Sequence, residues 1–134
     1  TTSGISFTIF QLAKHPDVQE RVYDEAVSIL GKDSTNKELT FQMLQDFRYL
    51  ESVIKEAMRL FPPVPFIGRK LVDDIEMNGT TIKAGQDFLV PIYAIHRNPK
   101  VYPDPERFDP ERFSDTAESR RGPYDYIPFS AGSR

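Results

Sequence analysis

A glutamate and an arginine three residues apart are the first pair whose spacing permits chemistry. Glu56 and Arg59 lie in the helix-like stretch LESVIKEAMRL, so their side chains are within reach of each other. On the helix alone they fall opposite the apolar stripe, beside Ser52 and Lys55, and this favours an exposed ion pair of small energetic value. The alternative is a buried pair that clamps another segment, which requires a further guanidinium and additional hydrogen bonds.

Three more arginines are candidates for contact with an anion. Arg112, inside the run FDPERF, presents a planar fork that a carboxylate or a group of carbonyls can hold, and the flanking phenylalanines would bury it. The alternative for this run is a turn-rich surface loop. Arg69 follows the apolar run 64–67, and Arg134 closes the small-residue run SAGSR. Taken singly, each of these two has the alternative of being an ordinary surface arginine.

Other reactive residue types are scarce. The hydroxyls of Thr1, Thr2 and Ser3 open a helix, where they either bond to the backbone or line a cavity. The chain has no cysteine, and its two histidines, His15 and His96, are far apart with no second ligand at metal spacing. His96 is therefore expected to be structural.

Composition and charge narrow the class of protein. The 134 residues suffice for about one domain. The net charge of −3, with both signs mixed along the chain, argues against a nucleic-acid partner. No apolar run approaches the roughly 20 residues that cross a bilayer. Because the chain has neither an initiator Met nor a signal pattern, we expect both ends to be cut from a longer protein.

The elements that must position these residues change in kind at Phe61. One proline precedes it and ten follow it. Helices are predicted over about 1–14, 16–30, 40–46 and 48–61, with Pro16 at a helix start, Gly31 as a stop and Thr40 as a cap. Strands are predicted over 69–72, 75–77, 80–82 and 88–92, with a hairpin turn at Asn78-Gly79. Pro-rich coil follows His96. The predicted fold class is mainly α with a small β portion (α+β).

The order and spacing of the motifs resemble the cytochrome P-450 monooxygenases along the entire chain. The matching runs are TTSGISF, HPDVQERVYDE, LESVIKEAMRLFPPVPFIGR, HRNPKVYPDPERFDPERF and YIPFSAGSR. PPVPFIGR looks most like family 4, many of whose members hydroxylate fatty acids near the chain end. The resemblance implies a partial P-450 fold in which residues 1–134 belong to a single domain, with helices to about 61 and short strands and a meander over 62–134.

The resemblance also implies roles for individual residues. Glu56 and Arg59 would form a structural network with Arg112, which is preferred to Arg107 because only the second PERF has the preceding Phe108. By the same resemblance, Arg69 and Arg134 would pair with the haem propionates, and Phe129 would pack beneath the haem. The substrate pocket would be lined by Val64, Pro65, Phe66 and Ile67. The oxygen-site helix would start at Thr1. The cysteine that ligates iron would follow Arg134 by two residues, so no metal ligand is expected within this chain.

By the same resemblance, the longer protein is a haem-dependent monooxygenase. It would activate O₂ at a thiolate-ligated iron and hydroxylate an apolar substrate such as a fatty acid or a foreign compound, with electrons from an NADPH-dependent reductase. Location in the endoplasmic reticulum membrane through an N-terminal anchor is also implied. The residues as given are not expected to bind haem or catalyse alone.

Two alternatives stay open. The first is a haem-free interaction domain that kept the scaffold, which the lack of cysteine favours and the intact FSAGSR run disfavours. The second is a haem-thiolate isomerase or dehydratase that works without a reductase.

Overall fold

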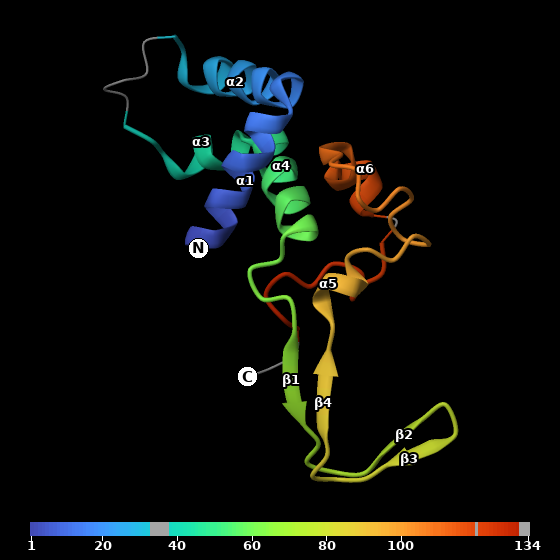
Figure 1. Ribbon diagram of the computed structural model, residues 1–134. Coiled ribbons are helices and arrows are strands. Elements are labelled where there is room, and N and C mark those ends of the chain that lie inside the picture. Colours follow the sequence, from blue (N-terminus) through green and yellow to red (C-terminus); the bar gives the residue numbers. More distant parts are fainter. Residues whose placement is uncertain (33–37, 120, 132–134) are drawn as a thin grey trace.

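Four helices form the larger end of the molecule. The computed structural model describes residues 1–32, 38–119 and 121–131, and Figure 1 shows the helices gathered at one end. They are α1 (Thr2–Lys14), α2 (Pro16–Leu30), α3 (Phe41–Asp46) and α4 (Arg48–Leu60). The predicted boundary signals act as expected, since Thr40 Oγ1 accepts a hydrogen bond from Met43 N at 3.2 Å and Gly31 ends α2 with a φ of 83°.

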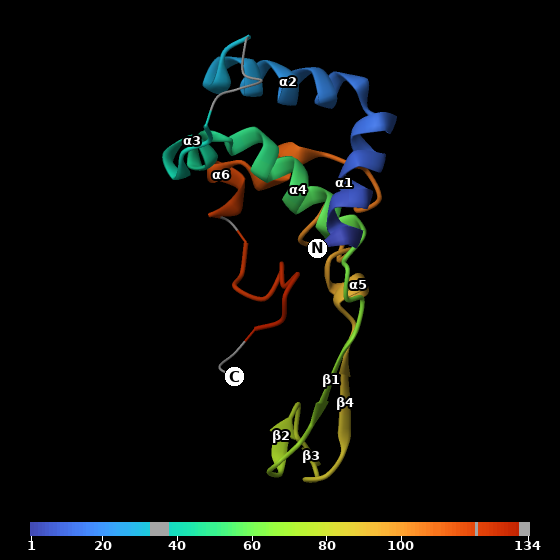
Figure 2. The same ribbon diagram turned by 90° about the vertical axis from the view of Figure 1, so that its left-hand side faces the viewer.

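Two antiparallel strand pairs form an arm that extends away from the helices (Figures 1 and 2). In the first, β1 (Ile67–Lys70) pairs with β4 (Asp87–Val90), with Ile67 opposite Val90. In the second, β2 (Ile75–Met77) and β3 (Thr80–Ile82) form the hairpin at the far end. Its turn residues, Asn78 and Gly79, both have positive φ, as a type I′ turn requires. Helices with two small antiparallel sheets confirm the predicted fold class.

The strand boundaries differ from the predicted ones at both long strands. β1 lies two residues earlier than 69–72, because its pairing with β4 begins at Ile67. β4 ends at Val90 rather than at residue 92, because Pro91 has no N–H to donate and its carbonyl instead accepts from Ile95 N at 3.0 Å.

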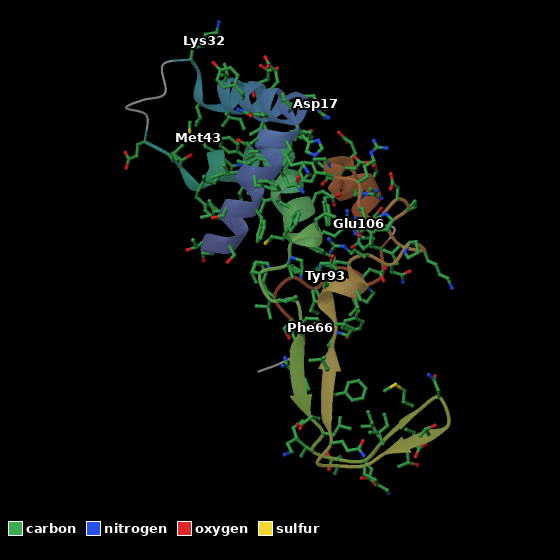
Figure 3. All side chains as sticks on the ribbon, in the orientation of Figure 1. Asp17, Lys32, Met43, Phe66, Tyr93 and Glu106 are labelled. Carbon is green, nitrogen blue, oxygen red and sulfur yellow. The ribbon has the colours of Figure 1, made fainter. Side chains whose placement is uncertain are left out.

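Short helices occur just before His96 and within the coil predicted after it. They are α5 (Ile92–Ile95), the 3₁₀ turn η1 (Pro110–Phe113) and α6 (Asp115–Glu118). η1 starts where Asp109 Oδ1 accepts a hydrogen bond from Glu111 N at 3.2 Å, with Pro110 at the first helical position. Figure 3 places Tyr93, on α5, and Phe66 at the junction between the helices and the strand arm.

The core lies around α4, which packs against α1, α2 and η1. Its buried apolar side chains are Val18, Val53, Ala57, Leu60 and Phe108. On α1, the apolar residues Ile5, Ile9 and Phe10 are largely exposed. Thr8 and Gln11 are its buried residues, and Thr8 satisfies its hydroxyl by donating to the Gly4 carbonyl at 2.8 Å.

Neither a membrane span nor a metal cluster is found in the part of the chain that the structure describes. None of the helices there is long and apolar enough to cross a bilayer. The same residues contain no group of three or more side chains of the kinds that ligate metals.

Candidate functional site

Arg59 is the most highly coordinated side chain on α4. Its Nε and Nη2 donate to Oε2 and Oε1 of Glu56 at 2.7 and 2.9 Å, which is the bidentate geometry of a strong ion pair. It also donates to three backbone carbonyls, those of His96 at 2.9 Å, Pro105 at 2.7 Å and Arg107 at 3.2 Å. All five bonds come from one guanidinium, and they tie α4 to the segment 96–107.

Glu56 has no exposed surface either, so its charge must be matched within the protein. Besides Arg59, it accepts from the backbone N–H of Asp109 at 2.9 Å. Burial raises the pKa of Glu56, while the hydrogen bond and charge of Arg59 and the Asp109 N–H oppose that rise. Because both oxygens accept from N–H donors, the geometry is that of an ionised carboxylate.

Arg112 is the second guanidinium at this cluster. Its Nε lies 3.6 Å from Oε1 of Glu56, and its Nη2 donates to the carbonyls of Pro103 and Asp104. Arg107 instead points outward, with 66% of its side chain exposed. The structure thus brings Arg112, and not Arg107, to Glu56, and the exposed-pair interpretation of Glu56 and Arg59 is wrong.

The reason the exposed-pair interpretation fails is visible along α4. Ser52, Glu56 and Arg59 form a buried polar stripe with hydrogen-bond partners in the segment 96–113, whereas the apolar Ile54 stays partly exposed. Ser52 Oγ is shared between the carbonyls of Arg48 and Phe113, at 3.2 and 3.0 Å. A helical wheel shows which side is polar, but it cannot show that another segment satisfies that side.

A second set of hydrogen bonds holds the segment 125–127. This segment leads into the last loop that the structure describes, residues 128–131. The Tyr102 hydroxyl donates to the Asp125 carbonyl at 3.0 Å, and the Tyr126 hydroxyl donates to the Lys55 carbonyl at 3.1 Å. Ile127 N donates to Nε2 of His96 at 2.9 Å. Sequence reasoning missed these three contacts, because the partners in each lie 23 to 71 positions apart and no local pattern marks them.

Arg69 reaches the last loop from β1. Its Nη2 donates to Oγ of Ser130 at 2.8 Å, and its Nη1 donates to the Gly68 carbonyl at 2.9 Å. Ser130 has a φ of 72°, so the loop backbone turns sharply there. A hollow of about 230 Å³ opens beside this contact. Its lining residues are Ile67, Arg69, Val90, Tyr124, Ile127, Ser130 and Ala131.

The other predicted site residues are spread over the surface. Val64, Pro65 and Phe66 are exposed and Ile67 is half-buried at the start of β1. Phe129 lies in the last loop with 75% of its surface exposed. Thr1 is exposed and its carbonyl accepts from Ile5 N at the start of α1. Arg134 lies outside the described residues.

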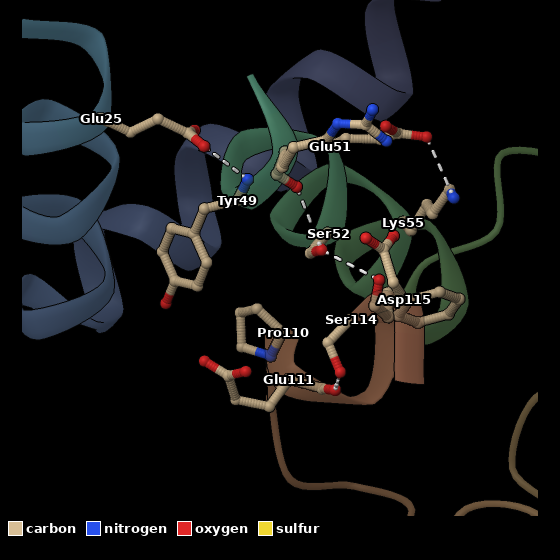
Figure 4. A pocket seen from close by; sticks show the side chains of 11 residues that line it. Glu25, Tyr49, Glu51, Ser52, Lys55, Pro110, Glu111, Ser114 and Asp115 are labelled. Atoms are coloured by element: carbon tan, nitrogen blue, oxygen red, sulfur yellow. Dashed lines mark hydrogen bonds and ion pairs between the residues drawn. The ribbon is translucent and has the colours of Figure 1, made fainter. Parts of the chain in front are cut away.

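A further hollow, of about 310 Å³, lies between α4 and η1 (Figure 4). Glu25 reaches across from α2, and its two carboxylate oxygens accept from Tyr49 N at 2.7 Å and Leu50 N at 2.9 Å. These are otherwise unpaired amides of the first turn of α4, so Glu25 caps that helix from a distance. Sequence reasoning missed this contact, because the cap lies on another helix.

Comparison of the chain with known proteins identifies its family. The family model of cytochrome P450 matches residues 1–134, which is the whole chain. The chain belongs to the cytochrome P450 family. It is 45% identical to cytochrome P450 4c3 of Drosophila melanogaster and 40% identical to cytochrome P450 4V2 of Rattus norvegicus, in both cases over the full chain and 25% of the relative. The family 4 resemblance is therefore confirmed.

The P450 chain described here spans about a quarter of the length of the curated relatives it matches. Membership implies a haem cofactor in the full-length protein. The residues present fit one edge of such a group. The hollow beside Ser130 has apolar walls from Ile67, Val90 and Ile127, and the exposed guanidinium of Arg69 stands at it. Haem is a flat apolar ring with two carboxylates at its rim, and apolar walls beside a cation suit such a group.

Proposed function

We propose that the full-length protein is a haem-dependent monooxygenase that hydroxylates an apolar organic substrate, such as a fatty acid or a foreign compound. One observation carries the proposal. The fully buried Glu56–Arg59 pair, held by meander carbonyls and by Arg112, occurs in a chain that matches the cytochrome P450 model end to end. A pair this costly to bury is retained where it fixes one geometry, and here that geometry joins α4 to the segment before the last loop.

Residues of the last loop and of β1 would hold the cofactor. Arg69 would pair with a haem propionate, because its guanidinium is exposed beside the apolar hollow. Arg134 is proposed for the same role on its sequence motif alone. Phe129 would pack beneath the macrocycle, which its exposed ring leaves free to do. When bound, haem supplies the oxygen-activating chemistry, and this chain's task is to hold and orient it.

The substrate side would be formed by the exposed residues that precede β1. Val64, Pro65 and Phe66, with the half-buried Ile67, present apolar surface without charge, as an apolar substrate requires. Thr1 is proposed to belong to the oxygen-site helix. Residues 1–134 would form part of a single domain, with the rest of the pocket contributed by the remainder of the protein.

The proposed redox partner and cellular location are those implied by the resemblance to the P450 family. An NADPH-dependent reductase would supply electrons, O₂ would be the second substrate, and a membrane anchor elsewhere in the protein would place it at the endoplasmic reticulum. The resemblance to family 4, many of whose members hydroxylate fatty acids, supports the choice of an apolar substrate class.

The test is a spectrum and a turnover assay on the full-length protein. We expect a cysteine two positions after Arg134, a carbon monoxide complex of the reduced protein with the absorbance of thiolate-ligated haem, and a hydroxylated product that requires NADPH, reductase and O₂. A haem-free protein with another residue at that position would support the interaction-domain alternative. Product formation without NADPH or reductase would support the isomerase alternative.

A further inference from the structure

His96 is bonded at both its backbone and its side chain to the two parts of the site. Its carbonyl accepts from Nη1 of Arg59 at 2.9 Å, and its Nε2 accepts from Ile127 N at 2.9 Å. The imidazole is fully buried and stacks on the ring of Tyr126, with the ring centroids 5.1 Å apart. One residue therefore connects the Arg59 cluster with the start of the last loop.

We propose that His96 is a positioning residue for the last loop, and that its imidazole sets the position of Ile127, and so of Phe129 and Ser130, relative to α4. The haem part of this proposal rests on the function proposed above. The geometric part does not, because it concerns only how the loop is held.

The bond from Ile127 to His96 fixes the state of the imidazole. Nε2 can accept the Ile127 N–H only when the ring is neutral, with its proton on Nδ1. The charged groups that act on the ring are Arg59 on α4 and the adjacent Arg97, and both disfavour a positive imidazolium. Burial, the largest cause, lowers the pKa of His96 to about 4, and the Arg59 backbone opposes this shift. The ring is therefore a neutral acceptor at physiological pH.

The loop is then held at two points three positions apart. Ile127 is fixed by His96, and Ser130 is fixed by Nη2 of Arg69 at 2.8 Å. Phe129 lies between these points with its ring exposed. Tyr102 and Tyr126 hold the preceding segment through carbonyls at Asp125 and Lys55. Loss of the His96 bond would thus leave Asp125 and Tyr126 in place, and would release the loop between Ile127 and the Ser130 contact with Arg69.

Two variants of the full-length protein test the two properties of the His96 side chain separately: its hydrogen-bond acceptor and its ring. His96→Gln places an amide oxygen near the position of Nε2 and keeps an acceptor for Ile127. His96→Phe keeps a ring that packs on Tyr126 but leaves the buried Ile127 N–H without a partner. The first measurement is amide hydrogen exchange of the peptide covering 125–131, and the second is the rate of haem transfer to apomyoglobin.

We expect His96→Phe to raise both the exchange rate of this peptide and the rate of haem loss about tenfold, which is the effect of one lost buried hydrogen bond. His96→Gln should stay within about threefold of wild type in both, since a bond to an amide oxygen replaces the original. Peptides from α4 should keep their protection in both variants.

Wild-type exchange at 125–131 in the Phe variant would overturn the proposal, and so would a Gln variant that exchanges as fast as the Phe variant. If the Phe variant does not fold, His96→Asn replaces it, because the shorter amide cannot reach Ile127 and the same loss is expected. A wild-type protein without haem would refute the proposed function alone, because the exchange measurement would still decide the role of His96.

Discussion

Arg59 Nε and Glu56 Oε2 lie 2.7 Å apart across one turn of α4, and neither side chain has any exposed surface. Because neither charge reaches water, each side chain depends on the other to balance its charge. Removal of Glu56 leaves the buried charge of Arg59 without its carboxylate partner.

In the full-length protein, Glu56→Ala should therefore prevent folding into a haem-loaded form. The stranded Arg59 charge costs about 3–5 kcal/mol, which is much of the stability of a typical domain. Arg59→Lys should fail similarly, because an ammonium cannot reproduce the five bonds of the guanidinium. The yield of soluble, haem-containing protein measures both effects.

The matched control is the pair of Arg21 and Glu111, which is also 2.7 Å apart but 57% exposed at each side chain. Glu111→Ala should change stability by no more than about 1 kcal/mol, because water screens an exposed pair. A normally folded, haem-replete Glu56→Ala protein would contradict the structural-network role of the buried pair.

Arg69→Ala should weaken haem retention and leave the fold intact. Arg69 is exposed, and its bonds go to Ser130 Oγ and the Gly68 carbonyl, so no buried group loses its partner. We expect haem transfer to apomyoglobin to accelerate about tenfold, as for one charge-assisted hydrogen bond. Lys70→Ala, the next exposed cation on β1, is the control. Equal haem loss rates in the two variants would remove Arg69 from the propionate assignment.

The buried His96 should make stability depend on pH. Its pKa of about 4 lies below the ordinary 6.5, so the unfolded chain takes up the proton first as the pH falls. The contribution to stability is complete above about pH 6.5 and falls by roughly 3 kcal/mol as the pH approaches 4. Urea unfolding of the full-length wild type and of His96→Gln, compared across this range, isolates the effect. Parallel pH profiles would contradict it.

Glu25→Gln should destabilise the protein by about 1 kcal/mol through α4. The carboxylate accepts from Tyr49 N and Leu50 N, and a single amide oxygen cannot replace two charged acceptors. Glu20→Gln, on the same helix and exposed, should change the unfolding midpoint little. Equal midpoints for the two variants would show that the cap contributes nothing.

Local signals predicted the local structure well and the site poorly. Thr40, Gly31 and the Asn78-Gly79 turn act through neighbours in the chain, so their elements appear within a few residues of the predicted positions. η1 could also have been predicted, because Asp109 before Pro110 is a standard helix start. The burial of Arg59 could not, because its carbonyl partners lie 37 to 48 residues away.

The motif resemblance supplied what periodicity could not. It favoured Arg112 over Arg107 from the sequence, and the structure brings Arg112 to Glu56. It assigned no role to His96, Tyr102 or Tyr126, whose bonds hold the segment 125–127. Each of these contacts depends on how distant segments meet, and a single sequence carries no local mark of that.

The long reach of Arg59 also has a consequence for synthesis on the ribosome. α4 leaves the exit tunnel before the carbonyls of His96, Pro105 and Arg107 have emerged, and before the amide of Asp109 can reach Glu56. At about 5–20 residues per second, several seconds pass in which this helix displays a solvated ion pair with no cover. The nascent chain can therefore complete α4 early, but it can close the cluster only after translation has passed residue 109.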